Sequence, residues 1–130
     1  MYRPRNTVTK RVVQKRQYEV QDASIFAGPA TWMMLHSMAA TYEPSQKESF
    51  TQLITGIQNN FPCKRCRDNF IKHLKELPLH NYLGNRDELF LWTYLMHDKV
   101  NQLKHVKSPP LQNVKKYYFE SLGIECSNCG

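Results

Sequence analysis

The spacing of apolar residues along the chain is helical almost throughout. From Phe50 through Ile54 and Ile57 to Phe61, apolar positions recur every three or four residues. This spacing places them on one face of a helix. No segment alternates with a period of two for long enough to predict a strand. The pattern therefore predicts an all-α protein.

Prolines and capping signals divide this pattern into five expected helices. They cover approximately residues 29–43, 45–61, 62–77, 87–104 and 111–122. Ser45 with Glu48 three positions later is a capping-box pattern, and Gly123 is a C-terminal stop signal. The first four helices have short connections, so we expect an antiparallel four-helix bundle with a short fifth helix. The fourth helix should bury a stripe of large apolar residues. These are Leu89, Trp92, Met96, Val100 and Leu103.

Charge changes this picture only at the ends of the chain. The 130 residues carry a net charge of +7, and six basic residues precede the first acidic residue, Glu19. Because the remainder is nearly neutral, we do not expect nucleic acid as a partner. We expect a basic flexible tail over residues 1–20, a helical domain over 21–122 and a flexible C-terminal tail over 123–130.

An uncharged stretch over residues 23–42 is nearly long enough to span a membrane. It carries polar groups along its length, however, including Ser24, His36 and Thr41. These groups are costly in hydrocarbon, so a buried helix of a bundle is favoured and no membrane span is expected. A secretory signal also fits poorly, because polar residues rather than an apolar run follow the basic start.

Four cysteines form two C-x-x-C pairs, Cys63 with Cys66 and Cys126 with Cys129. Such pairs suit a structural zinc site, inert buried thiols or redox-active disulfides. The wide separation of the pairs in the sequence is unusual for a zinc ribbon. A zinc-binding interaction module with a basic tail is therefore the alternative to a redox function.

Local chemistry favours a redox role for the first pair. Cys63 follows Pro62 in the expected first turn of a helix, and basic residues such as Lys64 surround it. Helix N-termini and positive charges stabilise a thiolate, which is the attacking species in disulfide exchange. The second pair lies at the end of the chain, where we expect no core to form. A terminal dithiol of this kind suits a shuttle that carries electrons between partners.

Inward-facing aromatic and polar residues accompany the first pair. Trp32 and His36 lie four positions apart on one expected helix, and His97 and Asn101 do so on another. Each pair alone is most often ordinary core packing. Together beside a C-x-x-C, they are suited to hold a flat, polar, aromatic cofactor.

At this point three segments resemble the ERV/ALR sulfhydryl oxidases. The run G-P-A-T-W-M-M-L-H at 28–36 is similar to that family's G-x-x-x-W-x-x-L-H, P-C-K-R-C at 62–66 to its P-C-x-x-C, and H-D-K-V-N at 97–101 to its H-N-x-V-N. The resemblance implies a four-helix bundle with a short fifth helix, a homodimer and non-covalently bound FAD. A compact chain of this kind also resembles the oxidases of large DNA viruses.

The resemblance also implies roles for individual residues. Lys104, or Lys107 or Lys116 in its place, would meet the phosphates, and Tyr118 fits the aromatic position that closes the adenine pocket better than Tyr117. The full set implied to bind FAD is Gly28, Thr31, Trp32, His36, Tyr42, His97, Val100, Asn101, Lys104, Lys116, Tyr117 and Tyr118. Asp98 stands where the family usually has Asn.

The implied activity is disulfide formation in protein substrates. Electrons would pass from Cys126 and Cys129 to Cys63 and Cys66, then to FAD and to oxygen, with release of hydrogen peroxide. We expect attack at Cys63, taken as the more accessible sulfur of its pair. Partners would be protein thiols or a thioredoxin-like carrier. The compartment would be the host cytoplasm or virion for a viral protein, and otherwise the mitochondrial intermembrane space or the secretory pathway.

Overall fold

The computed structural model describes residues 27–126 and residue 129, and all regular structure in this part of the chain is helical. Residues 27–40 are helical, and we refer to them as the first helix. The others are α2 (Lys47–Asn60), α3 (Lys64–Glu76), α4 (Arg86–Leu103) and α5 (Leu111–Ser121). Two short 3₁₀ turns, Pro44–Gln46 and Leu79–Tyr82, lie in the connections. The predicted all-α class is confirmed, and the expected basic tail, residues 1–20, lies outside the described residues.

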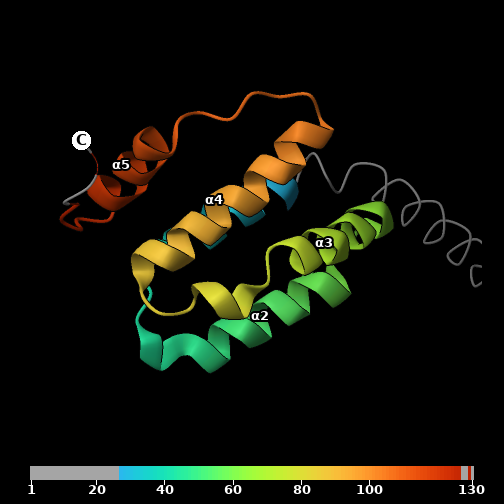
Figure 1. Cartoon of the computed structure of the whole chain (residues 1–130), viewed down its shortest axis with the longest axis horizontal. Helices are drawn as coiled ribbons and strands as arrows, with labels where there is room; N and C mark the ends of the chain where they lie inside the picture. Colours follow the sequence, from blue (N-terminus) through green and yellow to red (C-terminus); the bar gives the residue numbers. More distant parts are fainter. Residues whose placement is uncertain (1–26, 127–128, 130) are drawn as a thin grey trace, which may run out of the picture.

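The first helix and α2 to α4 alternate in direction (Figure 1). Packing joins α2 to α3, α3 to α4 and α4 to α5. After α4, the chain runs back to place α5 near the start of α4 (Figure 1). One end of the bundle therefore holds the start of α3 and the end of α4, and the opposite end holds the start of α4 and the C-terminal segment. None of the described helices is both long and apolar enough to cross a membrane.

The core is built around α4. Leu89, Trp92 and Met96 are fully buried, as their spacing predicts. The Trp92 Nε1–H donates to the Leu77 carbonyl over 2.9 Å, so its one polar group is satisfied at the α3 end. The predicted stripe is wrong at its last position, because Leu103 is 54% exposed where α4 leaves the core.

Two helix starts differ from the sequence-based expectation. Ser45 and Glu48 do not form the predicted capping box. Instead the Gln46 Oε1 accepts from the Glu43 N–H over 2.9 Å, because the chain already turns at Pro44, whose fixed φ suits a first turn. The third helix begins two residues later than expected, at Lys64.

Candidate functional site

The first cysteine pair lies at the start of α3. Cys63 is the N-cap of that helix, and its Sγ accepts from the Cys66 backbone N–H over 3.2 Å. The two residues form a disulfide, with their Cα atoms 5.2 Å apart. Cys63 is only 7% exposed, whereas Cys66 is half-buried. The expectation that Cys63 is the more accessible sulfur is therefore wrong, because the capping contact turns it back onto the first turn.

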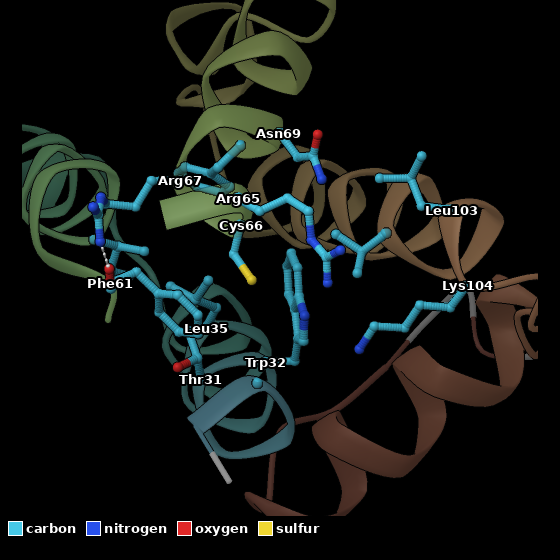
Figure 2. A pocket seen from close by; sticks show the side chains of 14 residues that line it. Thr31, Trp32, Leu35, Phe61, Arg65, Cys66, Arg67, Asn69, Leu103 and Lys104 are labelled. Carbon is cyan, nitrogen blue, oxygen red and sulfur yellow. Dashed lines mark hydrogen bonds between the residues drawn. The ribbon is translucent and has the colours of Figure 1, made fainter. Parts of the chain in front are cut away.

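A cavity of about 380 Å³ opens beside Cys66, between the first helix, α2, α3 and α4. The Cys66 sulfur points into this cavity toward the Trp32 ring (Figure 2). Leu35 and Phe70 provide apolar wall, and Arg65 and Lys104 extend into the cavity near Trp32 (Figure 2). Its size lies in the range of about 300–1,000 Å³ that is usual for small-molecule pockets.

A chain of hydrogen bonds lies behind Trp32. The Thr93 hydroxyl donates to the Phe90 carbonyl over 2.7 Å, so Thr93 Oγ1 accepts from His36 Nδ1–H over 2.9 Å. The other nitrogen of His36, Nε2, then accepts from His97 Nδ1–H over 3.1 Å. This order leaves the Nε2 of His97 as an acceptor. Trp32 stacks on the His97 ring, with centroids 4.5 Å apart and planes 2° from parallel.

His36 and His97, the two histidines in this hydrogen-bond chain, are neutral at neutral pH. Burial, together with a smaller contribution from the charge that His97 carries when it is protonated, lowers the pKa of His36 from 6.5 to about 4. Burial also lowers the pKa of His97, with a second contribution from Lys104. The hydrogen bonds require a neutral His36, whose Nε2 accepts, so the electrostatics agree with the geometry at this ring.

Asp98 has a defined role in this structure. Its Oδ1 accepts from the Ser108 hydroxyl over 2.6 Å, and Ser108 Oγ in turn accepts from Asn101 Nδ2 over 2.9 Å. Asp98 Oδ2 also accepts from Gln102 Nε2. The Asp98 carboxylate thus ties the connection after α4 to the helix. Through Ser108 it also orients the side-chain amide of Asn101, whose Oδ1 remains available as an acceptor.

The structure brings most of the predicted site residues together. Cavity-lining residues among them are Gly28, Thr31, Trp32, Cys66, Val100 and Lys104. His36 and His97 lie directly behind them, and the Tyr118 ring lies 5.1 Å from that of His36.

Other predicted residues lie apart from the cavity. Tyr42 is buried at the opposite end of the first helix, where its hydroxyl donates to the Leu83 carbonyl over 2.8 Å. Tyr117 is 61% exposed, and Lys116 is also exposed on α5. None of these three lines the cavity, so their place in the fold gives no support to a role there.

Sequence reasoning missed several lining residues. Asn69 and Phe70 follow Cys66 by three and four positions on α3, so they share its helix face and line the cavity. This spacing alone predicts that they lie beside Cys66. Arg65, the second residue between the paired cysteines, also lines the cavity, although its place in the sequence indicates only positive charge near Cys63. Phe61 gave no such signal, because it ends the stripe of α2 and its contact with this cavity depends on the turn into α3.

The second cysteine pair lies at the other end of the bundle. Gly123 has φ = 71°, a left-handed conformation that reverses the chain after α5, and the Ile124 N–H then donates to the Phe119 carbonyl. Ile124 and Cys126 pack against the core, and Cys129, disulfide-bonded to Cys126, is 8% exposed. The expectation that no core forms around this pair is therefore wrong.

The zinc alternative finds no support in this arrangement. Cys66 shares a cavity with Val100 at the end of α4, whereas Cys126 shares a second cavity with Asn85 at its start. At 1.5 Å per residue, these ends of the helix are about 22 Å apart. The four sulfurs cannot meet on one ion, and no group of three ligand side chains elsewhere in the described part of the chain could hold a metal.

These features define a class of protein: an all-helical domain that carries a C-x-x-C disulfide at the edge of an aromatic cavity. A sequence model of the Erv1 / Alr family matches residues 29–119, which is most of the chain. The chain therefore belongs to the Erv1 / Alr family.

Named relatives agree with this assignment. The chain is 34% identical over 79 residues to the FAD-linked sulfhydryl oxidase ERV1 of Arabidopsis thaliana, covering 58% of this chain and 40% of the relative. It is 33% identical over 79 residues to the mitochondrial FAD-linked sulfhydryl oxidase ERV1 of Saccharomyces cerevisiae, covering 58% and 41%. The chain is also 32% identical over 78 residues to the protein 096R of Invertebrate iridescent virus 3, which is named as an FAD-linked sulfhydryl oxidase. This match covers 57% of this chain and 53% of the relative. The matched part thus spans about half of these relatives or less, and no solved structure matches significantly.

Proposed function

We propose that the chain is an FAD-dependent thiol oxidase that forms disulfides in protein substrates. The observation that carries the proposal is the Cys66 sulfur, which belongs to a C-x-x-C disulfide and points into a cavity beside Trp32 (Figure 2). A helix N-terminus stabilises a thiolate there. The names of the relatives support the same activity.

The cavity residues fit FAD in shape and charge. Apolar walls and the Trp32 ring suit a flat ring system next to Cys66, with Gly28 and Thr31 at its edge. Arg65 and Lys104 supply positive charge for the two phosphates.

The adenosine part of FAD would lie toward α4. The Nε2 of His97 and the Oδ1 of Asn101 are acceptors suited to the amino and hydroxyl groups of adenosine. Val100 gives apolar contact, and Tyr118 packs against His36 from α5.

The two cysteine pairs would act as a relay. Substrate thiols would reduce the Cys126–Cys129 disulfide, and the resulting dithiol would reduce the Cys63–Cys66 disulfide. Attack at Cys63, which is 7% exposed, would free Cys66 as a thiolate inside the cavity. Bound FAD supplies the final chemistry, transfer of two electrons from the dithiol to oxygen with formation of hydrogen peroxide.

The distance along α4 favours a relay between two copies of the chain. From Leu122, at the end of α5, the four extended residues to Cys126 reach at most about 14 Å, which is less than the roughly 22 Å along α4 from Asn85 to Val100. With α5 in place, Cys126 itself therefore cannot reach Cys63 of its own chain, which favours Cys63 of a second copy as its target. Met33, Met34 and Met38 expose apolar surface on the first helix, as a homodimer interface requires.

The physiological partners would be protein thiols or a thioredoxin-like carrier. The mitochondrial yeast relative and the viral relative are compatible with the compartments expected above, namely host cytoplasm or virion, intermembrane space and secretory pathway.

Cys66→Ser tests the proposal. The purified protein should be yellow, and it should consume oxygen when given dithiothreitol. Cys66→Ser should lose this turnover and keep its flavin, because the walls of the cavity are unchanged. Cys126→Ser serves as the comparison, and it should lose far more activity toward a protein thiol than toward dithiothreitol. A colourless protein that binds no added FAD, or a Cys66→Ser variant with full turnover, contradicts the proposal.

A further inference from the structure

We infer that the second cavity is the binding groove for the reduced substrate and that Cys126 is the sulfur which the substrate attacks. The expected occupant is an extended polypeptide segment whose cysteine is flanked by Lys or Arg. This inference rests on the proposed thiol oxidase function and names the substrate class and the point where its electrons enter.

The groove is a built feature of the fold. It is an open cavity of about 730 Å³, and its walls come from the segment after the first helix, the start of α4 and the C-terminal segment. The buried rings of Tyr42 and Phe119 contribute to its lining, and the hydrogen bond from Tyr42 to Leu83 fixes the first of them. Asn85 is held as the N-cap of α4, where its Oδ1 accepts from the Glu88 N–H. An open cleft that is lined by three separate segments of the chain can take an extended polypeptide.

The two sulfurs of the pair differ in access. Cys126 is half-buried and lines the groove, whereas Cys129 is 8% exposed and does not line it. A thiolate lying in the groove therefore reaches Cys126, and Cys129 is placed to act as the leaving sulfur.

The exchange is balanced without any further reagent. The substrate thiolate bonds to Cys126, the Cys126–Cys129 bond breaks, and Cys129 leaves as a thiolate. A second substrate thiolate then attacks the sulfur of the first substrate cysteine in the mixed disulfide and releases Cys126 as a thiolate. The substrate loses two electrons in forming its disulfide, and the cysteine pair gains them.

The charges around the groove select the flanking residues. Among its carboxylates, Asp87 is paired with Lys115 over 2.9 Å, but Glu43 and Glu125 are exposed and form no ion pair with any described residue. Among the described residues that line the groove, Arg86 is the one cation. A Lys or Arg beside the substrate cysteine complements these carboxylates, and it also lowers the pKa of that cysteine and so raises the fraction of reactive thiolate.

Paired peptides test the charge preference. Two dithiol peptides that differ only in Lys or Glu next to the cysteines are compared as substrates of the full chain. The Lys peptide should have the higher kcat/KM, and the double variant Glu43→Gln/Glu125→Gln should reduce this preference by about threefold to tenfold, the size expected for two exposed charge pairs. Glu48→Gln removes a carboxylate on α2 outside the groove and should leave the preference unchanged. Equal kcat/KM for both peptides, or equal loss in both variants, overturns the inference.

Trapping tests the attacked sulfur. A Lys-flanked peptide with its cysteine activated as a mixed disulfide is added to Cys129→Ser, which keeps Cys126, and to Cys126→Ser, which keeps Cys129. Cys129→Ser should be captured at least about tenfold faster, and capture at equal rates overturns the assignment. If the unmodified chain oxidises dithiothreitol while these tests fail, the groove assignment is wrong and the proposed oxidase function stands. If it does not oxidise dithiothreitol, the proposed function itself fails.

Discussion

At the scale of single residues, the most informative contact is the one between Thr93 and His36. Thr93 is uncharged, and its hydrogen-bond partners, His36 and Phe90, do not line the cavity. Its hydroxyl nevertheless fixes which nitrogen of His36 carries the proton. Because His36 Nε2 accepts from His97 Nδ1–H, the tautomer of His36 also fixes that of His97, whose Nε2 is then an acceptor rather than a donor. Thr93 is thus a positioning residue for the part of the cavity where we propose that the adenosine of FAD lies.

We expect Thr93→Val to destabilise the protein and to weaken FAD binding. The buried His36 Nδ1–H loses its acceptor, which costs on the order of 1–3 kcal/mol of unfolding free energy. Denaturant unfolding measures the first effect, and FAD titration of the apoprotein measures the second. Nitrogen-15 NMR of the two imidazoles should show the change of tautomer directly. Thr93→Ser retains the hydroxyl and should restore all three properties, and a tautomer unaffected in Thr93→Val contradicts the positioning role.

The positions of single residues could be predicted where they lie within helices, and could not be predicted where a turn of the chain sets them. Trp32, Cys66 and Val100 lie at the cavity because helical spacing places them there. Tyr42, which only the resemblance implied at the FAD site, follows the end of the first helix and does not line the cavity. The accessibility of Cys63 could not be predicted either, since it depends on a capping contact of its own sulfur.

At the scale of elements, glycine marks the point where α5 ends and the C-terminal segment returns to the core. Gly123 is left-handed, and Ile124 binds back to Phe119 immediately after it. A Cβ is disfavoured in this conformation. The end of the helix at Gly123 was predicted. The packing of the residues after Gly123 against the core was not, because this packing depends on the buried ring of Phe119 at the far end of the bundle.

Two glycine substitutions should have opposite effects on stability. Gly123→Ala should lower the free energy of unfolding by about 1 kcal/mol, since alanine resists the left-handed backbone. Gly56→Ala, inside α2, should raise it by about 0.5–1 kcal/mol, because its Cβ meets no atom within 4 Å and alanine favours the helix. Denaturant melts of both variants provide the measurement. A change of the same sign in both would show that the backbone account is wrong.

At the scale of the whole molecule, α4 separates the two disulfides. Its 18 residues extend about 27 Å, with the cavity of Cys66 near one end and the groove of Cys126 near the other. Helix periodicity predicted each helix well, and the alternating directions follow from short connections. The connection from α4 to α5 carries no periodic pattern, so the sequence could not show that the second pair returns to the end remote from the first.

Mixing two inactive variants should restore activity if the relay runs between copies. Cys66→Ser keeps the second pair, and Cys126→Ser/Cys129→Ser keeps the first. After the subunits exchange, oxidation of a protein thiol should recover to roughly a quarter of the unmodified rate, because half of the dimers are mixed and each holds one complete relay. Oxygen consumption provides the readout. A mixture as inactive as its components would instead require a relay within one chain.

The spacing set by α4 has a consequence for inhibition. A compound lodged in the groove would compete with the thiol donor and leave oxygen kinetics untouched, whereas one lodged beside Trp32 would displace the flavin and stop both half-reactions. Two ligands of different shape could occupy one subunit together. The helix thus makes the donor end of this protein a target for inhibitors that need not resemble a nucleotide.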